Sequence, residues 1–385
     1  RLPWLVFTLP AGVITDRVDR RRAMVTMDIL RGVLTVGVAL AVLGEQGNLP
    51  GPESLDEVVG TNTGLYAVVL IATLLLGMCE VLRDNSAQTI LPNIVPADQL
   101  EKANGRMWSF EAVMNTFAGP PLGSLLLLAG FSLPFFVDAA TFFVAAALVC
   151  AIPGSFRVDR PPASGGGSFR AELIEGVRWL WAHPLLRPMA IILGLMNAAA
   201  LISMATFVLF AQEVMGVGPL TFTVIFFGAA IGGLVGGNIA PAVTKRFGSG
   251  TTLAITLAGS AAIPALVGLF PWWPLVLVLL GMNALLGILW NVVTVSLRQA
   301  IIPAGLLGRV NSVYRFFAWG MMPFGAALGG LIVFVMEHLT NRDIALRSTW
   351  FAVAIVHLGL FIVGRQKLTT AKLEAARSAA ASGPM

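Results

Sequence analysis

The sequence is poor in charge and in the side chains that carry most enzyme chemistry. Charged residues are 12% of its 385 positions, against roughly 25% in soluble domains. It contains only 3 His, 2 Cys and 2 Tyr, and the three His lie far apart in the chain. This composition excludes an ordinary soluble enzyme, a disordered chain and a nucleic-acid-binding protein, because each of these exposes much more polar surface.

The sequence also lacks the common motifs of catalysis and nucleotide binding. It contains no H-E-x-x-H, no G-x-x-x-x-G-K-[ST] and no G-x-S-x-G. We therefore expect no enzyme activity, no metal site, no cofactor and no direct use of ATP. Cys79 and Cys150 both fall in apolar stretches, which favours buried thiols.

Apolar residues are abundant, at 57% of the chain. They gather in runs, most of them near the roughly 20 residues that a transmembrane helix needs. Eleven such runs, the first one short, predict an all-α polytopic membrane protein. The runs are 2–15, 24–43, 64–83, 104–128, 131–152, 188–210, 219–243, 251–270, 272–297, 310–336 and 348–364.

Basic residues occupy every second loop between these runs. Of the 25 Lys and Arg residues, 22 fall in six alternate stretches at and between the runs, 15–31, 83–106, 153–187, 245–246, 298–315 and the tail from 365. Basic loops stay on the cytoplasmic side of a membrane. The pattern predicts that residues 16–23, 92–103, 153–187 and the C-terminal tail are cytoplasmic.

A weak internal repeat divides the chain in two. Residues 86–92 (SAQTILP) resemble residues 297–303 (LRQAIIP), and an asparagine follows each block, Asn104 and Asn311, near the start of another apolar run. Related halves are typical of secondary transporters. The alignment leaves the first half without its opening helix, so we expect this chain to begin within the second of twelve helices. The predicted parts are an N-terminal bundle (1–152, helices 2–6), a cytoplasmic linker with an amphipathic helix (153–187), a C-terminal bundle (188–366, helices 7–12) and a tail (367–385).

Residues 12–22 (GVITDRVDRRR) carry a family resemblance. They resemble the G-x-x-x-D-R-x-G-R-R loop between the second and third helices of the major facilitator superfamily. The match falls at Gly12, Asp16, Arg17, Arg20 and Arg21, whereas Asp19 stands where the family has glycine. The resemblance implies two pseudo-symmetric six-helix bundles, of which about eleven spans are present, and a gating role for the matching residues.

A second segment, residues 119–124 (GPPLGS), resembles the antiporter motif G-x-x-x-G-P-x-x-G-G of the drug/proton antiporter branch. It matches at Gly119, Pro120 and Gly123, and Asn115 and Ser124 replace the outer glycines. The block 80–124 is similar to enterobactin exporters and to macrolide and multidrug efflux proteins. This resemblance implies export across the bacterial cytoplasmic (inner) membrane.

Ionisable residues inside the apolar runs need a reason, because a charge at mid-bilayer costs roughly 3 kcal/mol. Glu80, Asp84, Glu111 and Asp138 are candidates for proton coupling. If Glu80 and Glu111 face each other at low dielectric, both cannot stay ionised. A structural ion-pair network is the alternative. Further gate candidates are Asp28, Arg31, Arg83 and Arg315, and Asp28 and Arg31 are expected to pair with each other or with Asp16.

Asn, Met and aromatic side chains in the same runs suit a promiscuous apolar cavity. Packing against other helices is the alternative for each of them. Gly228, Gly232 and Gly236 recur every four residues and predict a face on which another helix packs closely within the chain. The candidate cavity residues are Met114, Phe117, Asn197, Asn283, Trp290, Asn291 and Phe317.

These patterns together predict a secondary active transporter. It would export a lipophilic or amphipathic small molecule of the drug or siderophore type by proton antiport and alternating access, with the proton gradient as its energy source. A proton-coupled importer of a small solute and an inactive truncated fragment are the alternatives. The expected partners are the substrate, protons and membrane lipids, without nucleic acid, and the expected state is a monomer. The substrate, the proton stoichiometry and the coupling carboxylate are not determined by the sequence.

Overall fold

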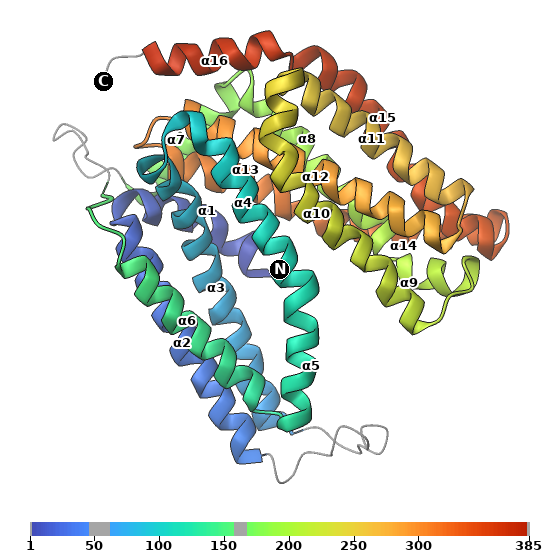
Figure 1. The fold of residues 1–385 in the computed structure, drawn as a ribbon, viewed down its shortest axis with the longest axis horizontal. Coiled ribbons are helices and arrows are strands. Elements are labelled where there is room, and N and C mark those ends of the chain that lie inside the picture. Colours follow the sequence, from blue (N-terminus) through green and yellow to red (C-terminus); the bar gives the residue numbers. More distant parts are fainter. Residues whose placement is uncertain (1, 46–61, 158–167, 383–385) are drawn as a thin grey trace. The chain divides into compact units, whose positions relative to one another are not determined.

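The protein is described from a computed structural model, drawn in Figure 1, over residues 2–45, 62–157 and 168–382. Residues 158–167 of the predicted linker and 383–385 of the tail lie outside the described residues. Within the described ranges every regular element is a helix. The helices up to the linker are α1 (Leu2–Arg17), α2 (Arg20–Glu45), α3 (Thr63–Ile94), η2 (Ala97–Gln99), α4 (Leu100–Val113), η3 (Met114–Ala118), α5 (Gly119–Ala129) and α6 (Leu133–Cys150).

The remaining helices begin inside the predicted linker, with α7 (Phe169–Ala182). After α7 come α8 (Leu186–Met204), α9 (Phe207–Leu209), η4 (Phe210–Val214), α10 (Pro219–Phe247), α11 (Ser249–Leu269), α12 (Trp273–Ile301), α13 (Leu307–Gly320), α14 (Met322–Leu339), α15 (Arg342–Lys367) and α16 (Thr370–Ser382).

The predicted apolar runs all fall on helices, which confirms a helical polytopic membrane protein. Among the described residues, nine helical segments are long and apolar enough to cross a membrane. Two predicted runs are not among them. The first forms α1, which has only 16 residues. The run 104–128 is divided into α4, the π-helical turn η3 and α5, because Pro120 and Pro121 lack the N–H groups that would continue a regular helix.

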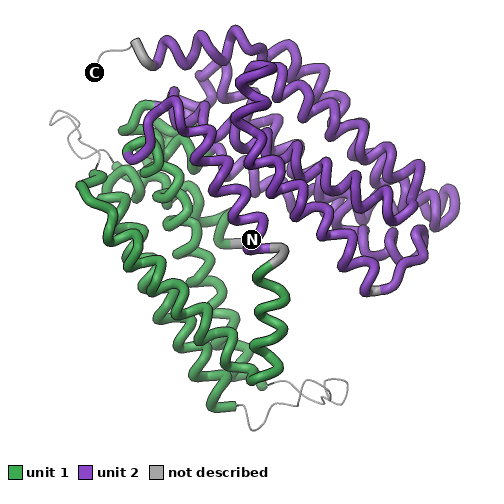
Figure 2. Tube along the Cα trace, viewed as in Figure 1, with its two compact units in different colours: residues 1–93, 118–177, 303–313 green, residues 94–117, 178–302, 314–385 purple. Residues whose placement is uncertain are grey.

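The described helices gather into two compact units, coloured separately in Figure 2. Each unit draws on both halves of the sequence. Contacts within one conformation do not say which helices move together, so the bundle boundaries at 152 and 188 stay a prediction. Unit 1 comprises residues 1–93, 118–177 and 303–313, and unit 2 comprises residues 94–117, 178–302 and 314–385.

In unit 1, α2 packs along α6. Gly32 of α2 permits this approach, because a Cβ there would overlap the ring of Phe143. Near the far end of the same pair, Val38 and Val42 form an apolar cluster with Ala72 of α3. The sequence thus places small and branched apolar residues where α2 meets its neighbours.

In unit 2, α10 packs along α12 through the predicted glycine face. A Cβ at Gly228 would overlap the backbone of Leu277, and a Cβ at Gly232 would overlap that of Gly281. The absence of side chains lets the two backbones approach closely. The prediction of a close-packing face within the chain is confirmed, and α12 is the helix that packs there.

Candidate functional site

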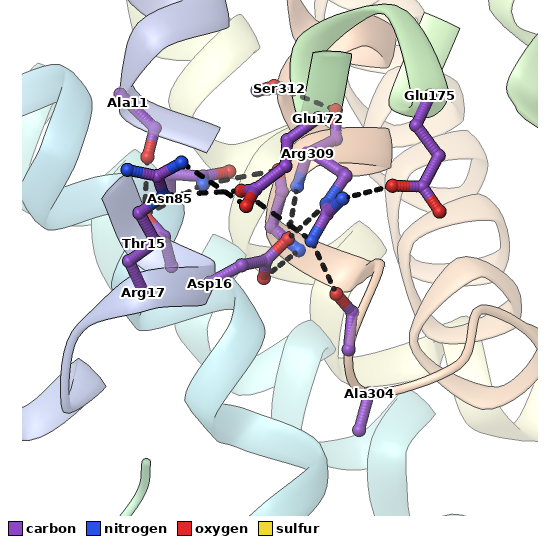
Figure 3. Close-up of polar contacts among 12 residues, drawn as sticks. Ala11, Thr15, Asp16, Arg17, Asn85, Glu172, Glu175, Ala304, Arg309 and Ser312 are labelled. Carbon is purple, nitrogen blue, oxygen red and sulfur yellow. Dashed lines mark hydrogen bonds and ion pairs between the residues drawn. The ribbon is translucent and has the colours of Figure 1, made fainter. Parts of the chain in front are cut away.

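Asp16, at the end of α1, caps the first turn of α13. Its Oδ1 accepts the backbone N–H of Gly308 at 2.9 Å, and its Oδ2 accepts that of Arg309 at 3.0 Å (Figure 3). The N–H groups of a first helical turn have no partner inside the helix, and the negative charge of a carboxylate is favourable at that end. The predicted motif therefore holds a helix that belongs to the other half of the sequence.

Two arginines flank the carboxylate of Asp16. Arg309 Nε lies 3.2 Å from Oδ2, and Arg20 Nη2 lies 3.7 Å from Oδ1. The guanidinium of Arg20 also donates to the backbone oxygens of Thr89 and Ala304, each at 2.9 Å. The side chains of Asp16 and Arg20 are almost completely buried. Removing one member of such a buried charge group is strongly unfavourable, because the others lose their compensation.

The same arginine extends the cluster to α7. Arg309 Nη1 contacts Glu175 at 2.5 Å, and Arg309 Nη2 lies 3.9 Å from Glu172. Glu172 in turn accepts two hydrogen bonds from Arg17, at 3.2 and 3.3 Å. Acids and bases thus alternate from Arg17 through Glu172 and Arg309 to Asp16 (Figure 3), and Arg20 follows Asp16. We call Arg17, Glu172, Glu175, Arg309, Asp16 and Arg20 the charge relay.

α1 and α13 cross closely beside the charge relay. A Cβ at Gly12 would overlap the side chain of Ser312 and the backbone of Gly308, so glycine is required there. Asn85 of α3 donates to Thr15 Oγ1 at 3.0 Å and accepts a hydrogen bond from Asn311 at 2.9 Å. A buried set of amides and hydroxyls therefore surrounds the crossing.

Unit 2 contains a second crossing of the same construction, between α4 and α10. A Cβ on Gly105 would overlap the backbone of Gly237, and a Cβ on Gly237 would overlap the Ser109 hydroxyl. Asn104 donates to Gln299 Oε1 of α12 at 2.7 Å. A first-half helix is again held by second-half helices.

The two crossings correct the register of the predicted repeat. Residues 105–109 (GRMWS) and 308–312 (GRVNS) share the pattern G-R-x-x-S, and the Gly and Ser of each meet a glycine of the crossing helix. Asn104 and Asn311, used to align the halves, do not occupy equivalent places in this pattern. The pattern was visible in the sequence and would have identified Arg309, which the sequence analysis missed.

Asp19, which replaces the family's glycine, has a defined role in the turn between α1 and α2. Its Oδ1 accepts the N–H of Arg22 at 2.9 Å, which caps α2, and its Oδ2 accepts the N–H of Phe156 at 2.9 Å. Partial burial alone would raise the pKa of this carboxyl. The hydrogen bonds from Arg22 and Phe156 outweigh burial and hold the pKa below its usual value.

A second ionic cluster lies in unit 1, on α2, α3 and α6. Asp28 is buried and lies 3.4 Å from Arg83 and 3.8 Å from Arg31. Arg31 stacks on the ring of Phe142 of α6, and Asp138 lies one turn before Phe142 on that helix. The structure thus brings Asp28 to Arg31, as the sequence suggested, adds Arg83 to the same group, and has Asp138 on the helix that Arg31 contacts.

The other ionisable candidates are placed as follows. Asp84 Oδ1 lies 3.9 Å from its neighbour Arg83. Glu80 lies on α3 in unit 1 and Glu111 on α4 in unit 2, so the predicted facing of these two carboxylates stays a prediction. The arginine that the structure brings to Asp16 from α13 is Arg309, six residues before the candidate Arg315. Arg21 donates to the backbone oxygen of Ile152 at 2.6 Å.

The antiporter motif lies where the helix is interrupted. Asn115 is in the π-helical turn η3, and Gly119 and Pro120 begin α5. Ser124 Oγ donates to the backbone oxygen of Pro120 at 2.9 Å, and a Cβ on Gly123 would meet nothing within 4 Å. The motif thus marks a local change of helix geometry.

The cavity candidates do not share one environment. Met114 is exposed, Asn283, Asn291 and Phe317 are half-buried, and Trp290 is buried at 1% exposure. Asn197 of α8 donates to the backbone oxygen of Ala318 on α13 at 2.8 Å. In this structure its amide therefore joins two helices. The side chain of Phe117 lies outside the described residues. A cavity role for these residues stays a prediction.

A set of apolar helices held by buried ionic and amide contacts between the two sequence halves is typical of secondary transporters. The Major Facilitator Superfamily profile matches residues 2–327, and the chain belongs to this family. Enterobactin exporter EntS of Salmonella choleraesuis (strain SC-B67) is 25% identical over 356 residues, which cover 91% of this chain and 78% of that protein. EntS of Escherichia coli O1:K1 / APEC is 26% identical over 356 residues, with the same coverage of both proteins.

Solved structures show the same fold. A bacterial homologue of the iron transporter ferroportin, in an outward-facing state, aligns with a TM-score of 0.66 and 17% identity, over 95% of this chain and 88% of that one. The transporter FucP, in the outward conformation, aligns with a TM-score of 0.68 and 15% identity, over 94% of this chain and 87% of that one. This protein is therefore a multi-pass membrane protein of a transporter family.

Proposed function

We propose that this protein is a proton antiporter that exports a lipophilic or amphipathic small molecule of the siderophore or drug class. Similarity to enterobactin exporters over 91% of the chain supports export. The excess of basic residues in alternate loops supports a cytoplasmic position for residues 16–23 and the tail, in the bacterial cytoplasmic membrane.

One observation carries the mechanism: the capping of α13 by Asp16. The contact joins segments 292 residues apart in the chain and depends on charge and hydrogen bonds. A transporter must make and break such contacts each time its site changes sides. We propose that the charge relay is the cytoplasmic gate, closed here and opened when substrate enters from the cytoplasm.

The group around Arg31 supports the coupling step. Asp28 lies 3.8 Å from this arginine, and Asp138 lies one turn before Phe142, on whose ring the arginine stacks. Protonation of either carboxylate would weaken its attraction to Arg31 and free the cation for the other acid. We propose that a proton binds to this group when the substrate is released, and that the proton then moves inward. Glu80 and Glu111 remain the alternative coupling residues, with Asp84 beside them.

The test is transport by full chain reconstituted into liposomes, with radiolabelled enterobactin or a lipophilic cationic dye as substrate. An acidic interior should drive uptake into the liposomes, and collapsing the gradient with an ionophore should stop it. An acidic exterior driving uptake would instead identify an importer. Movement that ignores both gradients, in liposomes that retain them, would refute proton coupling.

Neutral variants then locate the coupling residue. Asp138→Asn should keep substrate exchange without a gradient and lose gradient-driven uptake, because only the proton step is removed. Glu80→Gln and Glu111→Gln test the alternatives in the same assay. Glu213→Gln, which removes an exposed acid paired with Arg342, is the matched control and should behave like wild type.

A further inference from the structure

We propose that a groove at the basic end of α2 is a binding site for a phospholipid with an anionic headgroup. The groove lies within unit 1 and has a volume of about 620 Å³. Its walls come from the ends of α1 and α2, from α3 and from the segment that follows α6. It therefore opens where an apolar helix gives way to arginines, the depth at which lipid headgroups lie.

Backbone contacts build the groove. The segment 152–157 is bound to the turn between α1 and α2, with Phe156 N–H donating to Asp19 at 2.9 Å and Arg20 N–H donating to the Phe156 oxygen at 3.4 Å. The hydrogen bond from Arg21 to Ile152 adds a third tie. These bonds fix Arg157 on one wall of the groove.

The described residues at the rim of the groove carry net positive charge, with three arginines against one aspartate. Arg22 and Arg157 both line it, and both are exposed. Asp19 also lines it, but its oxygens already accept hydrogen bonds from Arg22 N–H, Ser155 and Phe156 N–H. Arg17, the third arginine of the groove, is paired with Glu172. Two arginines at one groove attract an anion, and the planar fork of a guanidinium group matches the oxygens of a phosphate.

We call the apolar part of the lining, Ile14, Val18, Met27 and Leu82, the floor of the groove. Met27 lies more than one helical turn further along α2 than Arg22. A free phosphate ion would leave these side chains uncovered, whereas a lipid places its glycerol and first methylene groups against them. Charge at the rim and hydrocarbon on the floor match one molecule that surrounds every membrane protein, an anionic phospholipid.

The experiment uses full chain in nanodiscs made of phosphatidylcholine with a minor share of phosphatidylglycerol. The probe is phosphatidylglycerol with a photoactivatable group near the start of one acyl chain. After illumination, mass spectrometry should find the label on peptides that contain Met27 or Leu82. Arg22→Gln with Arg157→Gln should lower the labelling about tenfold or more, since each arginine near a membrane surface strengthens anionic lipid binding about fivefold.

Two further variants make the test specific. Arg365→Gln with Lys367→Gln removes two exposed charges from the basic end of α15 and should leave the labelling unchanged. Thr26→Trp fills the groove without changing charge and should lower labelling. Thr26→Trp also serves as the test variant if the double arginine variant aggregates and no longer elutes as a single peak in size-exclusion chromatography.

Three outcomes overturn the proposal. Equal loss in both charge variants would show diffuse attraction to the membrane rather than a site. Equal labelling by a phosphatidylcholine probe would show an unselective apolar groove. Displacement by millimolar inorganic phosphate, with no label on the floor residues, would show a site for a soluble anion.

Discussion

Asp16 and Arg309 are 293 residues apart in the chain, yet the Asp16 carboxylate accepts both the backbone N–H and the side-chain Nε–H of Arg309, at 3.0 and 3.2 Å. One acid therefore satisfies the start of a helix and the cation of that helix together. The strength of this double contact sets how firmly the proposed gate closes.

Asp16→Asn should weaken the gate while keeping its shape. The amide retains one acceptor oxygen but loses the charge that faces Arg309, Arg20 and the positive end of α13. We expect a loss of about 2–4 kcal/mol in thermal unfolding in detergent and a large fall in transport. Asp343→Asn, which removes an exposed acid in the first turn of α15 paired with Arg347, is the control and should cost less than about 1 kcal/mol. Equal effects of the two variants would contradict a special role for Asp16.

The amide contact between α4 and α12 can be measured by a double-mutant cycle. Asn104 is buried and donates to Gln299 at 2.7 Å. Asn104→Ala and Gln299→Ala should each destabilise, and the double variant should show a coupling energy of about 1 kcal/mol. The partly exposed Asn238, which donates mainly within its own helix, supplies the control in Asn238→Ala. Strict additivity of the Asn104 and Gln299 effects would mean that this hydrogen bond contributes nothing.

Gly232→Ala tests the contact between α10 and α12. The added methyl would overlap the backbone of Gly281, which cannot move aside as a side chain can. We expect destabilisation by about 2–3 kcal/mol. Gly330→Ala is the matched control on α14, where a Cβ meets nothing within 4 Å; it should be neutral or stabilising by up to about 1 kcal/mol. The measurement is the unfolding midpoint in detergent, and a tolerated Gly232→Ala would refute the packing.

The C-terminal helix α16 should stabilise the start of α4 by contacting it. Arg377 contacts Glu101 at 2.7 Å, and the Thr370 hydroxyl accepts the Gly250 N–H at the start of α11 at 3.1 Å. Arg377→Glu should increase hydrogen exchange both in α16 and at the start of α4, and adding Glu101→Arg should reverse the increase. Lys372→Glu is the control, because it reverses the charge of a residue on α16 that donates to the nearby Gln366 backbone. Unchanged exchange in Arg377→Glu would show that Leu373 and Thr370 hold α16 without the ion pair.

The turn between α1 and α2 should respond to acid through Asp19. Its pKa is lowered in the folded protein from a model-compound value of 3.8, so the ionised form is the one that folding favours. Its contribution is complete above pH values near 3.8 and is lost as the pH falls through the lowered pKa. The difference in unfolding midpoint between wild type and Asp19→Asn should be constant from pH 5 to 8 and shrink in stronger acid. A difference that grows in acid would contradict this sign.

Much of the fold follows from the sequence, because apolar length and alternating basic loops report directly on a bilayer. All eleven predicted runs lie mainly on helices, with short breaks at residues 205–206 and 321. The interruption at residues 114–118 was not predicted, since the pattern of apolar residues continues through it and only the paired prolines indicate it.

The site was predicted only in part. The motif at Gly12, Asp16 and Arg20 identified one side of the crossing. The other side, Gly308 and Arg309, consists of backbone N–H groups and one of many loop arginines, and backbone amides leave no mark in a sequence. Only comparison of the two G-R-x-x-S segments would have found it.

The two crossings share the G-R-x-x-S pattern but differ in the residue that follows the crossing glycine by one turn. Four residues after the crossing glycine, α1 has Asp16, whereas α10 has Pro241, which carries neither charge nor acceptor side chain. Ions and pH can therefore act on the α1–α13 contact through the Asp16 carboxylate, while the α4–α10 contact depends on close packing and on the neutral hydrogen bonds of Ser109. Salt concentration and acidity should therefore distinguish two crossings that both bring helix backbones close together.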